Sequence, residues 1–139
     1  ELLFNRTNRR QNVLEFVGHA PHVERLHYVS TAYVSGAARG TFRETDLDVG
    51  QGFKNHYEET KFQAEVEVAR SAVPRTIFRP GVVVGDSKTG ETAKFDGPYF
   101  AVKAMTRVPS PGAFLRIGPG RNYGNLVPVD FIVEALAHV

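Results

Sequence analysis

The sequence predicts an α/β fold built on a parallel sheet, and two observations support this class. Segments with helical periodicity alternate with short apolar runs in the order helix, strand, helix, strand, helix, strand, helix. The apolar runs are nearly continuous, which is typical of parallel strands that are covered on both faces. At 139 residues and 42% hydrophobic content, the chain is long enough to build one domain with a core.

Most of the predicted elements have a start or stop signal. They are, in chain order, a helix over 5–18, a strand over 26–29, a loop over 35–52, a helix over 55–71, strands over 76–78 and 82–85, a loop over 86–97, a helix over 98–107, strands over 114–117 and 126–129, and a helix over 131–138. Asn55 is expected to cap the second helix, with Glu58 as its reciprocal partner. Pro98 suits the first position of the third helix, and Asp130 is expected to cap the last one.

Composition excludes several classes of protein. There is no cysteine, so disulfides and zinc–thiolate sites are ruled out, which suits a cytoplasmic location. No run approaches 18 apolar residues, so no membrane span is expected. The net charge is +2 and the arginines are scattered, which argues against a nucleic-acid partner. His19 and His22 flank Pro21 in a turn, so no metal site is expected.

A tyrosine and a lysine four residues apart, Tyr57 and Lys61, are the strongest candidates for chemistry. Within a helix this spacing stacks the two side chains on one face. A lysine ammonium that close favours a phenolate and lowers the pKa of a tyrosine from roughly 10 toward neutrality. Glu58 and Glu59 between them are expected to form a solvated face. The same spacing recurs at Tyr99 and Lys103, but that pair follows a polar loop rather than a strand with terminal hydroxyls.

Two hydroxyl residues, Ser30 and Thr31, follow the first predicted strand directly. In α/β proteins the carboxyl ends of parallel strands border the crevice where ligands bind. One of these hydroxyls could therefore orient a carbonyl group. The alternative is that both simply form hydrogen bonds with the backbone where the strand ends.

Three ordered motifs, YVSTAYV (28–34), YEETK (57–61) and FRPGVVVGD (78–86), resemble the extended short-chain dehydrogenase/reductase superfamily. Within it, GDSKTGET (85–92) and VPVD (127–130) look like the branch of thioester reductase domains and male-sterility-type fatty acyl reductases. The resemblance covers nearly the whole chain. It implies a Rossmann-like, doubly wound parallel sheet of which only the C-terminal half is present, over 1–85, with a small substrate-binding or lid region over 86–139.

The resemblance also implies the site residues. Thr31, three residues before Val34, stands at the position of the catalytic hydroxyl, with Tyr57 as acid/base and Lys61 as its activator. The expected nicotinamide contacts are Ser30, Tyr57, Lys61, Pro80, Gly81, Val82 and Val83. The cofactor would be NADP or NAD, with NADP slightly preferred, and the partner a small-molecule carbonyl or acyl substrate.

The glycine-rich phosphate loop of such reductases, G-x-x-G-x-x-G, does not occur in the 139 residues. That loop holds the pyrophosphate at a helix N-terminus, so we expect the chain alone to bind a dinucleotide poorly. Two alternatives to a reductase remain open at this point. One is a nucleotide-sugar epimerase or dehydratase on the same scaffold, and the other is a non-catalytic fragment.

Overall fold

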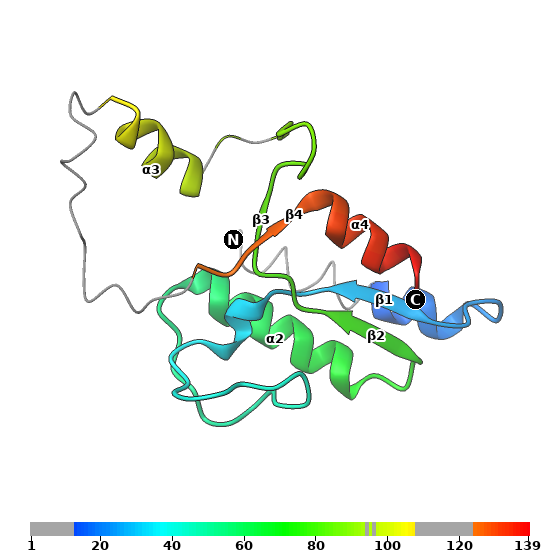
Figure 1. The fold of residues 1–139 in the computed structure, drawn as a ribbon. Coiled ribbons are helices and arrows are strands. Elements are labelled where there is room, and N and C mark those ends of the chain that lie inside the picture. Colours follow the sequence, from blue (N-terminus) through cyan, green and yellow to red (C-terminus); the bar gives the residue numbers. More distant parts are fainter. Residues whose placement is uncertain (1–12, 94, 96, 108–123) are drawn as a thin grey trace, which may run out of the picture. The chain divides into compact units, whose positions relative to one another are not determined.

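The computed structural model describes residues 13–93, 95, 97–107 and 124–139. It divides the chain into two compact units, residues 1–81 and 82–139, and each is described by itself. Both units combine helices with a pair of parallel strands (Figure 1). The predicted α/β class with parallel strands is therefore confirmed, whereas the doubly wound arrangement and the functional boundary at residue 85 stay predictions. No helix among the described residues is long and apolar enough to cross a membrane.

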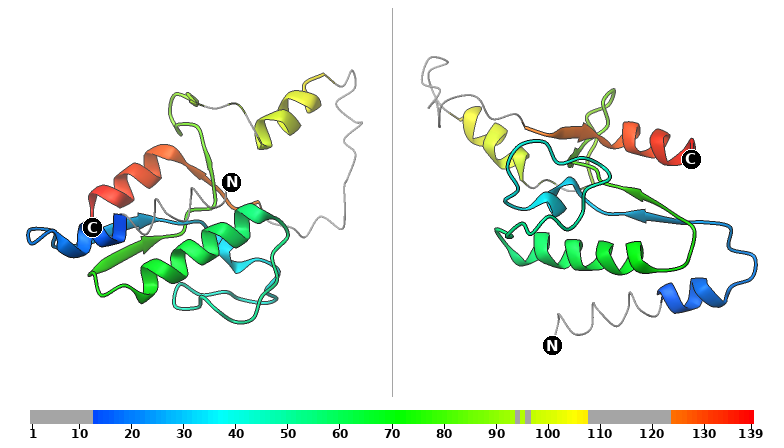
Figure 2. Two further views of the ribbon diagram at one scale, coloured as in Figure 1. Left: turned by 180° about the vertical axis from the view of Figure 1, so that it is seen from behind. Right: turned by 90° about the horizontal axis from the view of Figure 1, so that it is seen from below.

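The first unit is a strand–helix–strand arrangement. Residues 13–19 are helical, as predicted, and the earlier part of that predicted helix lies outside the described residues. The elements that follow are β1 (Leu26–Val29), the short 3₁₀ helix η1 (Ala32–Ser35), α2 (His56–Arg70) and β2 (Arg75–Phe78). β1 and β2 pair in parallel, with Leu26 opposite Arg75 and Val29 opposite Phe78. A parallel pair needs a crossover connection, and α2 provides it (Figure 2).

Both ends of α2 are closed by side chains. Asn55 Oδ1 accepts a hydrogen bond from the Glu58 N–H at 2.9 Å, and Glu58 Oε2 accepts from the Lys54 N–H at 2.9 Å. At the other end, the Arg75 guanidinium donates to the carbonyls of Ala69, Ser71 and Val73. The predicted cap by Asn55 and Glu58 is therefore confirmed.

The expectation that Glu58 is solvated is wrong. Its side chain reaches back over the start of the helix and accepts from the Lys54 N–H and the Asn55 side-chain amide, and the residue is only 4% exposed. A carboxylate at a helix N-terminus also interacts favourably with the helix dipole. Glu59, by contrast, does lie on the outer side, where His56 Nδ1 is 3.6 Å from its carboxylate.

The core of the first unit lies between η1 and α2. Val34, Ala64 and Val68 are its buried apolar side chains among the described residues. β1 and β2 lie where strands were predicted. The expectation that they are buried is wrong. His27 and Val29 are exposed and alternate with half-buried neighbours, which is the pattern of a strand that is covered on one face.

A loop over residues 36–52, here called the closed loop, connects η1 to α2. Its two ends are tied by a hydrogen bond from the Ala37 N–H to the Gly52 carbonyl at 2.8 Å. Gly36 has φ +52°, and a Cβ at this position would meet the Gly52 carbonyl oxygen. Inside the loop, Gln51 Nε2 donates to the carbonyls of Val34 and Leu47. The loop is thus an ordered structure with adjacent ends rather than an open excursion.

The second unit contains β3 (Val82–Val84), α3 (Pro98–Met105), β4 (Leu126–Pro128) and α4 (Val129–Ala137). β3 and β4 pair in parallel, with Val82 opposite Leu126. Pro98 begins α3 as predicted, because a proline at the first helical position loses no hydrogen bond. The predicted strand over 114–117 lies outside the described residues.

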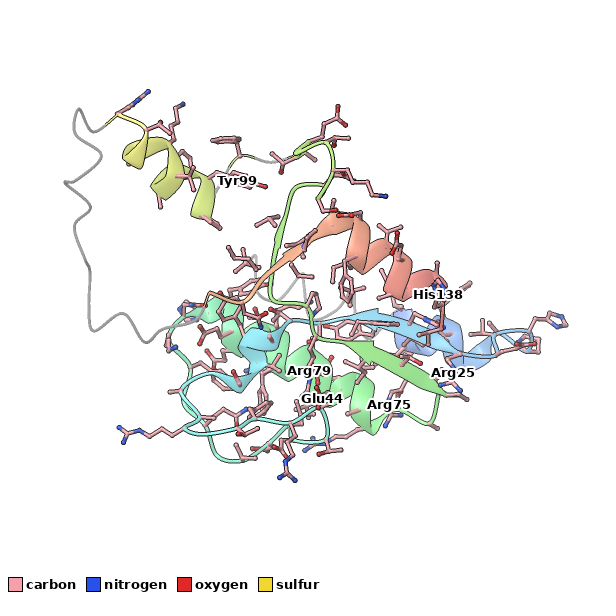
Figure 3. The ribbon with its side chains drawn as sticks, viewed as in Figure 1. Arg25, Glu44, Arg75, Arg79, Tyr99 and His138 are labelled. Atoms are coloured by element: carbon pink, nitrogen blue, oxygen red, sulfur yellow. The ribbon has the colours of Figure 1, made fainter. Side chains whose placement is uncertain are left out.

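The predicted cap of the last helix by Asp130 is wrong. The helix begins at Val129, so Asp130 lies inside its first turn, and its carboxylate accepts from the Ser87 N–H at 3.0 Å and the Ser87 hydroxyl at 2.6 Å. The carboxylate therefore ties the loop after β3 to the start of α4. In the same loop, the Gly85 N–H donates to the Tyr99 hydroxyl at 2.5 Å, and Asp86 Oδ1 accepts from the N–H groups of Lys88 and Thr89 (Figure 3).

These hydrogen bonds should make the stability of the loop after β3 depend on pH. Backbone hydrogen bonds from Thr89 and Lys88 lower the pKa of Asp86, and the side-chain and backbone hydrogen bonds from Ser87 lower the pKa of Asp130, both from an ordinary value of 3.8. A carboxylate with a lowered folded-state pKa contributes stability above its unfolded pKa and loses it as pH falls through the folded value.

We therefore expect amide exchange in residues 85–91 to accelerate as the pH is lowered below about 3.8, after correction for intrinsic rates. Asp130→Asn should reduce that acceleration, because an uncharged side chain has no carboxylate to protonate. Hydrogen exchange between pH 2.5 and 6, read by mass spectrometry, measures it. An identical pH dependence in the wild type and in Asp130→Asn would contradict the assignment to this residue.

Candidate active site

The carboxyl ends of β1 and β2 meet at the residues that directly follow the two strands. The Ser30 N–H donates to the Phe78 carbonyl at 2.7 Å, and the Ala32 N–H donates to the Pro80 carbonyl at 2.8 Å. The parallel hydrogen bonding thus continues past both strands. It brings the predicted hydroxyl residues, Ser30 and Thr31, to the same edge as Pro80, where α/β proteins bind ligands.

Thr31 is buried, at 4% exposure, and its hydroxyl contacts the backbone on two sides. Oγ1 accepts a hydrogen bond from the Tyr33 N–H at 3.3 Å and so caps η1. The hydroxyl faces the Pro80 carbonyl at 3.5 Å, which is longer than the 2.5–3.0 Å of a strong O–H···O bond. The hydroxyl proton is therefore held weakly and can turn to another acceptor.

Lys61 reaches the same end of β1 from α2. Its Nζ donates to the Val29 carbonyl at 2.9 Å and lies 5.1 Å from the centre of the Tyr28 ring. A main-chain oxygen and an aromatic face are both favourable partners for an ammonium group. The fold thus places a positive charge one residue before the two hydroxyls.

Tyr57 lies in the first turn of α2, one helical turn before Lys61. The residue is 53% exposed, and its carbonyl accepts from the Thr60 hydroxyl at 3.1 Å. The four-residue spacing puts the phenol on the same face of the helix as Lys61, so it is available to a molecule bound beside this face.

The structure adds residues that the sequence reasoning missed. Glu65, one turn after Lys61, is fully buried, and its Oε2 accepts from the Ser30 hydroxyl. Its Oε1 accepts from Arg79 Nε at 2.8 Å and Arg79 Nη2 at 2.5 Å. The sequence gives one indication of this role: Glu65 follows Lys61 by four residues and so lies on the same face of the helix as Tyr57 and Lys61.

The remaining predicted residues fall into two groups. Pro80 and Gly81 directly follow Arg79, and Pro80 is part of the strand-end contacts described above. Val82 and Val83 are the first two residues of β3 in the second unit. The alternative pair also lies in the second unit, where the Tyr99 hydroxyl accepts from Gly85 and its ring packs on Phe95, with centroids 4.8 Å apart. Tyr99 therefore has a structural role in its own unit.

The chain is similar to a known family and to two curated proteins. The NAD-binding family described as male sterility protein matches residues 6–136. Fatty acyl-CoA reductase wat of Drosophila melanogaster is 35% identical over 88 residues, which cover 62% of this chain and 17% of the reductase. The nonribosomal peptide synthetase cpsA of Aspergillus campestris is 30% identical over 141 residues, 92% of this chain and 13% of the synthetase. The chain thus spans less than a fifth of either relative, and no solved structure matches.

Proposed function

This chain belongs to the male sterility protein family of NAD-binding domains, in its thioester-reductase-like branch, and we propose that it supplies the catalytic set of a nicotinamide-dependent reductase. The substrate proposed is an acyl thioester, or the aldehyde derived from it. One observation carries the proposal: the buried Thr31 hydroxyl, which faces the Pro80 carbonyl, and the Lys61 ammonium, which donates to the Val29 carbonyl, are both held at the carboxyl end of β1.

The proposed roles follow from the chemistry of each group. Thr31 donates a hydrogen bond from its weakly held hydroxyl to the carbonyl oxygen of the substrate and so orients it. Tyr57 delivers a proton to the same oxygen as negative charge develops there. Lys61 favours the phenolate that remains on Tyr57. Together they supply the hydrogen bond, the proton and the positive charge that carbonyl reduction requires.

The donor groups at this edge fit a nicotinamide cofactor. An ammonium that bonds to a main-chain oxygen in the free chain can also donate to the hydroxyls of a ribose. In the proposal, Tyr57, Lys61 and Ser30 contact the ribose side, while the backbone of Pro80 and Gly81 contacts the carboxamide. The contacts expected of Val82 and Val83, in the second unit, stay predictions. When bound, the nicotinamide supplies the hydride. NADP is preferred slightly over NAD, and a cytoplasmic location is part of the same proposal.

A spectrophotometric assay of the full-length protein tests this function. We expect loss of NADPH or NADH absorbance on addition of an acyl-CoA, with release of free thiol and formation of an aldehyde or alcohol. A series of acyl chain lengths would narrow the substrate class. Conversion of a nucleotide sugar without net oxidation of the cofactor, together with no reaction of acyl thioesters, would instead identify an epimerase.

Substitution of the two hydroxyls separates their roles. Thr31→Val keeps the shape and removes the proton donor, so it should lower turnover by about 10²–10³-fold, the usual effect of losing one oxyanion donor. Ser30→Ala should have a much smaller effect. Both are read as kcat in the reductase assay, with circular dichroism as the check on folding. If Ser30→Ala is the more damaging change, the catalytic hydroxyl has been assigned one residue too late.

A further inference from the structure

A buried carboxylate connects three separate parts of the first unit. The side chain of Glu65 has no exposed area, and that of Arg79 is 14% exposed. Glu65 accepts from the Ser30 hydroxyl at the end of β1 and, through its other oxygen, from two nitrogens of Arg79 after β2. A charge in such a place is costly unless it is paired, and here both oxygens have donors.

Arg79 extends this network to the closed loop. Its Nη1 donates to the Arg43 carbonyl at 3.2 Å, and its guanidinium carbon lies 5.6 Å from the centre of the Phe42 ring. The same Arg43 carbonyl accepts from the Asp46 N–H at 3.0 Å. Arg79, labelled in Figure 3, therefore joins the loop to the residues that follow both strands.

We propose that Glu65 is a positioning residue of the candidate active site, acting through Ser30 and Arg79. Its contact with Ser30 fixes the backbone on which Thr31 stands, and its contact with Arg79 fixes the residue before Pro80. The distance between Thr31 Oγ1 and the Pro80 carbonyl oxygen then determines the direction in which the catalytic hydroxyl points. This inference rests on the proposed function and deepens it by naming a residue that touches neither substrate nor cofactor.

The chemistry of the network favours this role over simple ion pairing. Ser30 has one hydroxyl proton and donates it in a hydrogen bond to Glu65. The orientation of the Ser30 side chain is therefore determined by a carboxylate acceptor. A glutamine at position 65 has one acceptor oxygen and one donor nitrogen. Ser30 and Arg79 bond to different oxygens of Glu65, so in glutamine one of them meets a donor nitrogen in place of an acceptor, and that connection must reverse or break.

Glu65→Gln in the full-length protein is the principal test. We expect kcat to fall about tenfold, a part of the roughly 10²-fold that a misplacement of 1 Å can cost. The KM for the cofactor should change less than kcat, by about twofold at most, because the proposed contacts from Tyr57 and Lys61 are kept. Glu59→Gln, on the outer side of the same helix, is the matched control and should leave kcat unchanged.

A double variant decides whether Glu65 acts through Ser30. If it does, Ser30→Ala combined with Glu65→Gln should be no slower than Glu65→Gln alone, because groups that act as a unit are not additive. Multiplication of the two effects on kcat would overturn that part of the proposal. All variants should be assayed at a temperature at which circular dichroism shows them fully folded.

Hydrogen exchange tests the positioning role of Glu65 independently of the proposed reductase activity. Glu65→Gln should accelerate exchange of the Ser30, Ala32 and Asp46 amides, which bond to carbonyls at the strand ends and in the closed loop. Glu59→Gln should not. This result does not need a substrate, so it decides the positioning role even if the protein reduces no acyl thioester. Unchanged exchange at all three amides would overturn the proposal.

Discussion

Tyr57→Phe should lower the turnover of the full-length protein by about 10²–10⁴-fold, the usual contribution of a positioned acid. The substitution removes one hydroxyl from a half-exposed ring, so the fold should hardly change. The affinity for the cofactor should also stay nearly constant, because Lys61 and Ser30 keep their proposed contacts with the ribose. Reductase kinetics with NADPH, together with equilibrium titration of the cofactor by fluorescence, would measure both quantities. The expected pattern is a reduced kcat with a nearly constant dissociation constant.

Two further variants make this result specific. Lys61→Met should lower turnover and also weaken cofactor binding, because the same ammonium is proposed to serve the phenol and the ribose. Tyr99→Phe is the matched control in the second unit, where its hydroxyl accepts from the Gly85 N–H. That change should leave proton transfer intact. Loss of activity in Tyr99→Phe with normal turnover in Tyr57→Phe would show that the wrong tyrosine–lysine pair had been selected.

The second large effect concerns stability. Glu65→Ala should lower the free energy of unfolding by about 3–5 kcal/mol, because removing one partner of a buried ion pair leaves the Arg79 charge without its carboxylate. Urea denaturation followed by circular dichroism would measure it. Glu59→Ala removes a carboxylate whose ion pair among the described residues is with the exposed His56, and it should change the stability by less than about 0.5 kcal/mol. Equal losses in the two variants would contradict the burial argument.

The local signals in the sequence were sufficient for the elements that carry the site. Asn55 and Glu58 predicted where α2 begins, and Pro98 predicted the start of α3, because capping depends on residues within one helical turn. The strand over residues 26–29 was also placed correctly. These features need no knowledge of distant parts of the chain.

Three of the failures have a common physical cause, which is that they depend on contacts between distant residues. Asp130 looks like a cap in the sequence, yet its partner is Ser87, 43 residues earlier. Glu65 looks like one more polar helical residue, and only the approach of Ser30 and Arg79 makes it a buried connection. The burial of β1 was overestimated because the composition of a strand does not reveal how many layers cover it.

The catalytic roles of Thr31, Tyr57 and Lys61 stay predictions. The structure gives the positions of these residues relative to the end of β1. Thr31 and Lys61 come to one strand end because the parallel pairing and α2 direct them there. That juxtaposition could be anticipated from the sequence, since residues after a parallel strand and on the following helix share an edge. The separation between the hydroxyl and the Pro80 carbonyl could not, because it depends on the backbone after β2.

Because of the hydrogen bond between Ala37 and Gly52, the geometry at the base of the closed loop does not depend on how long the loop is. Because the two ends are tied at that bond, residues can be gained or lost near Gly40 without altering the distance between η1 and α2. The entropic cost of a longer loop is small, about 0.6 kcal/mol for a doubling of its length. The tip of the closed loop can therefore change in sequence and in size while the residues at its base, and the start of α2 that follows them, keep their places.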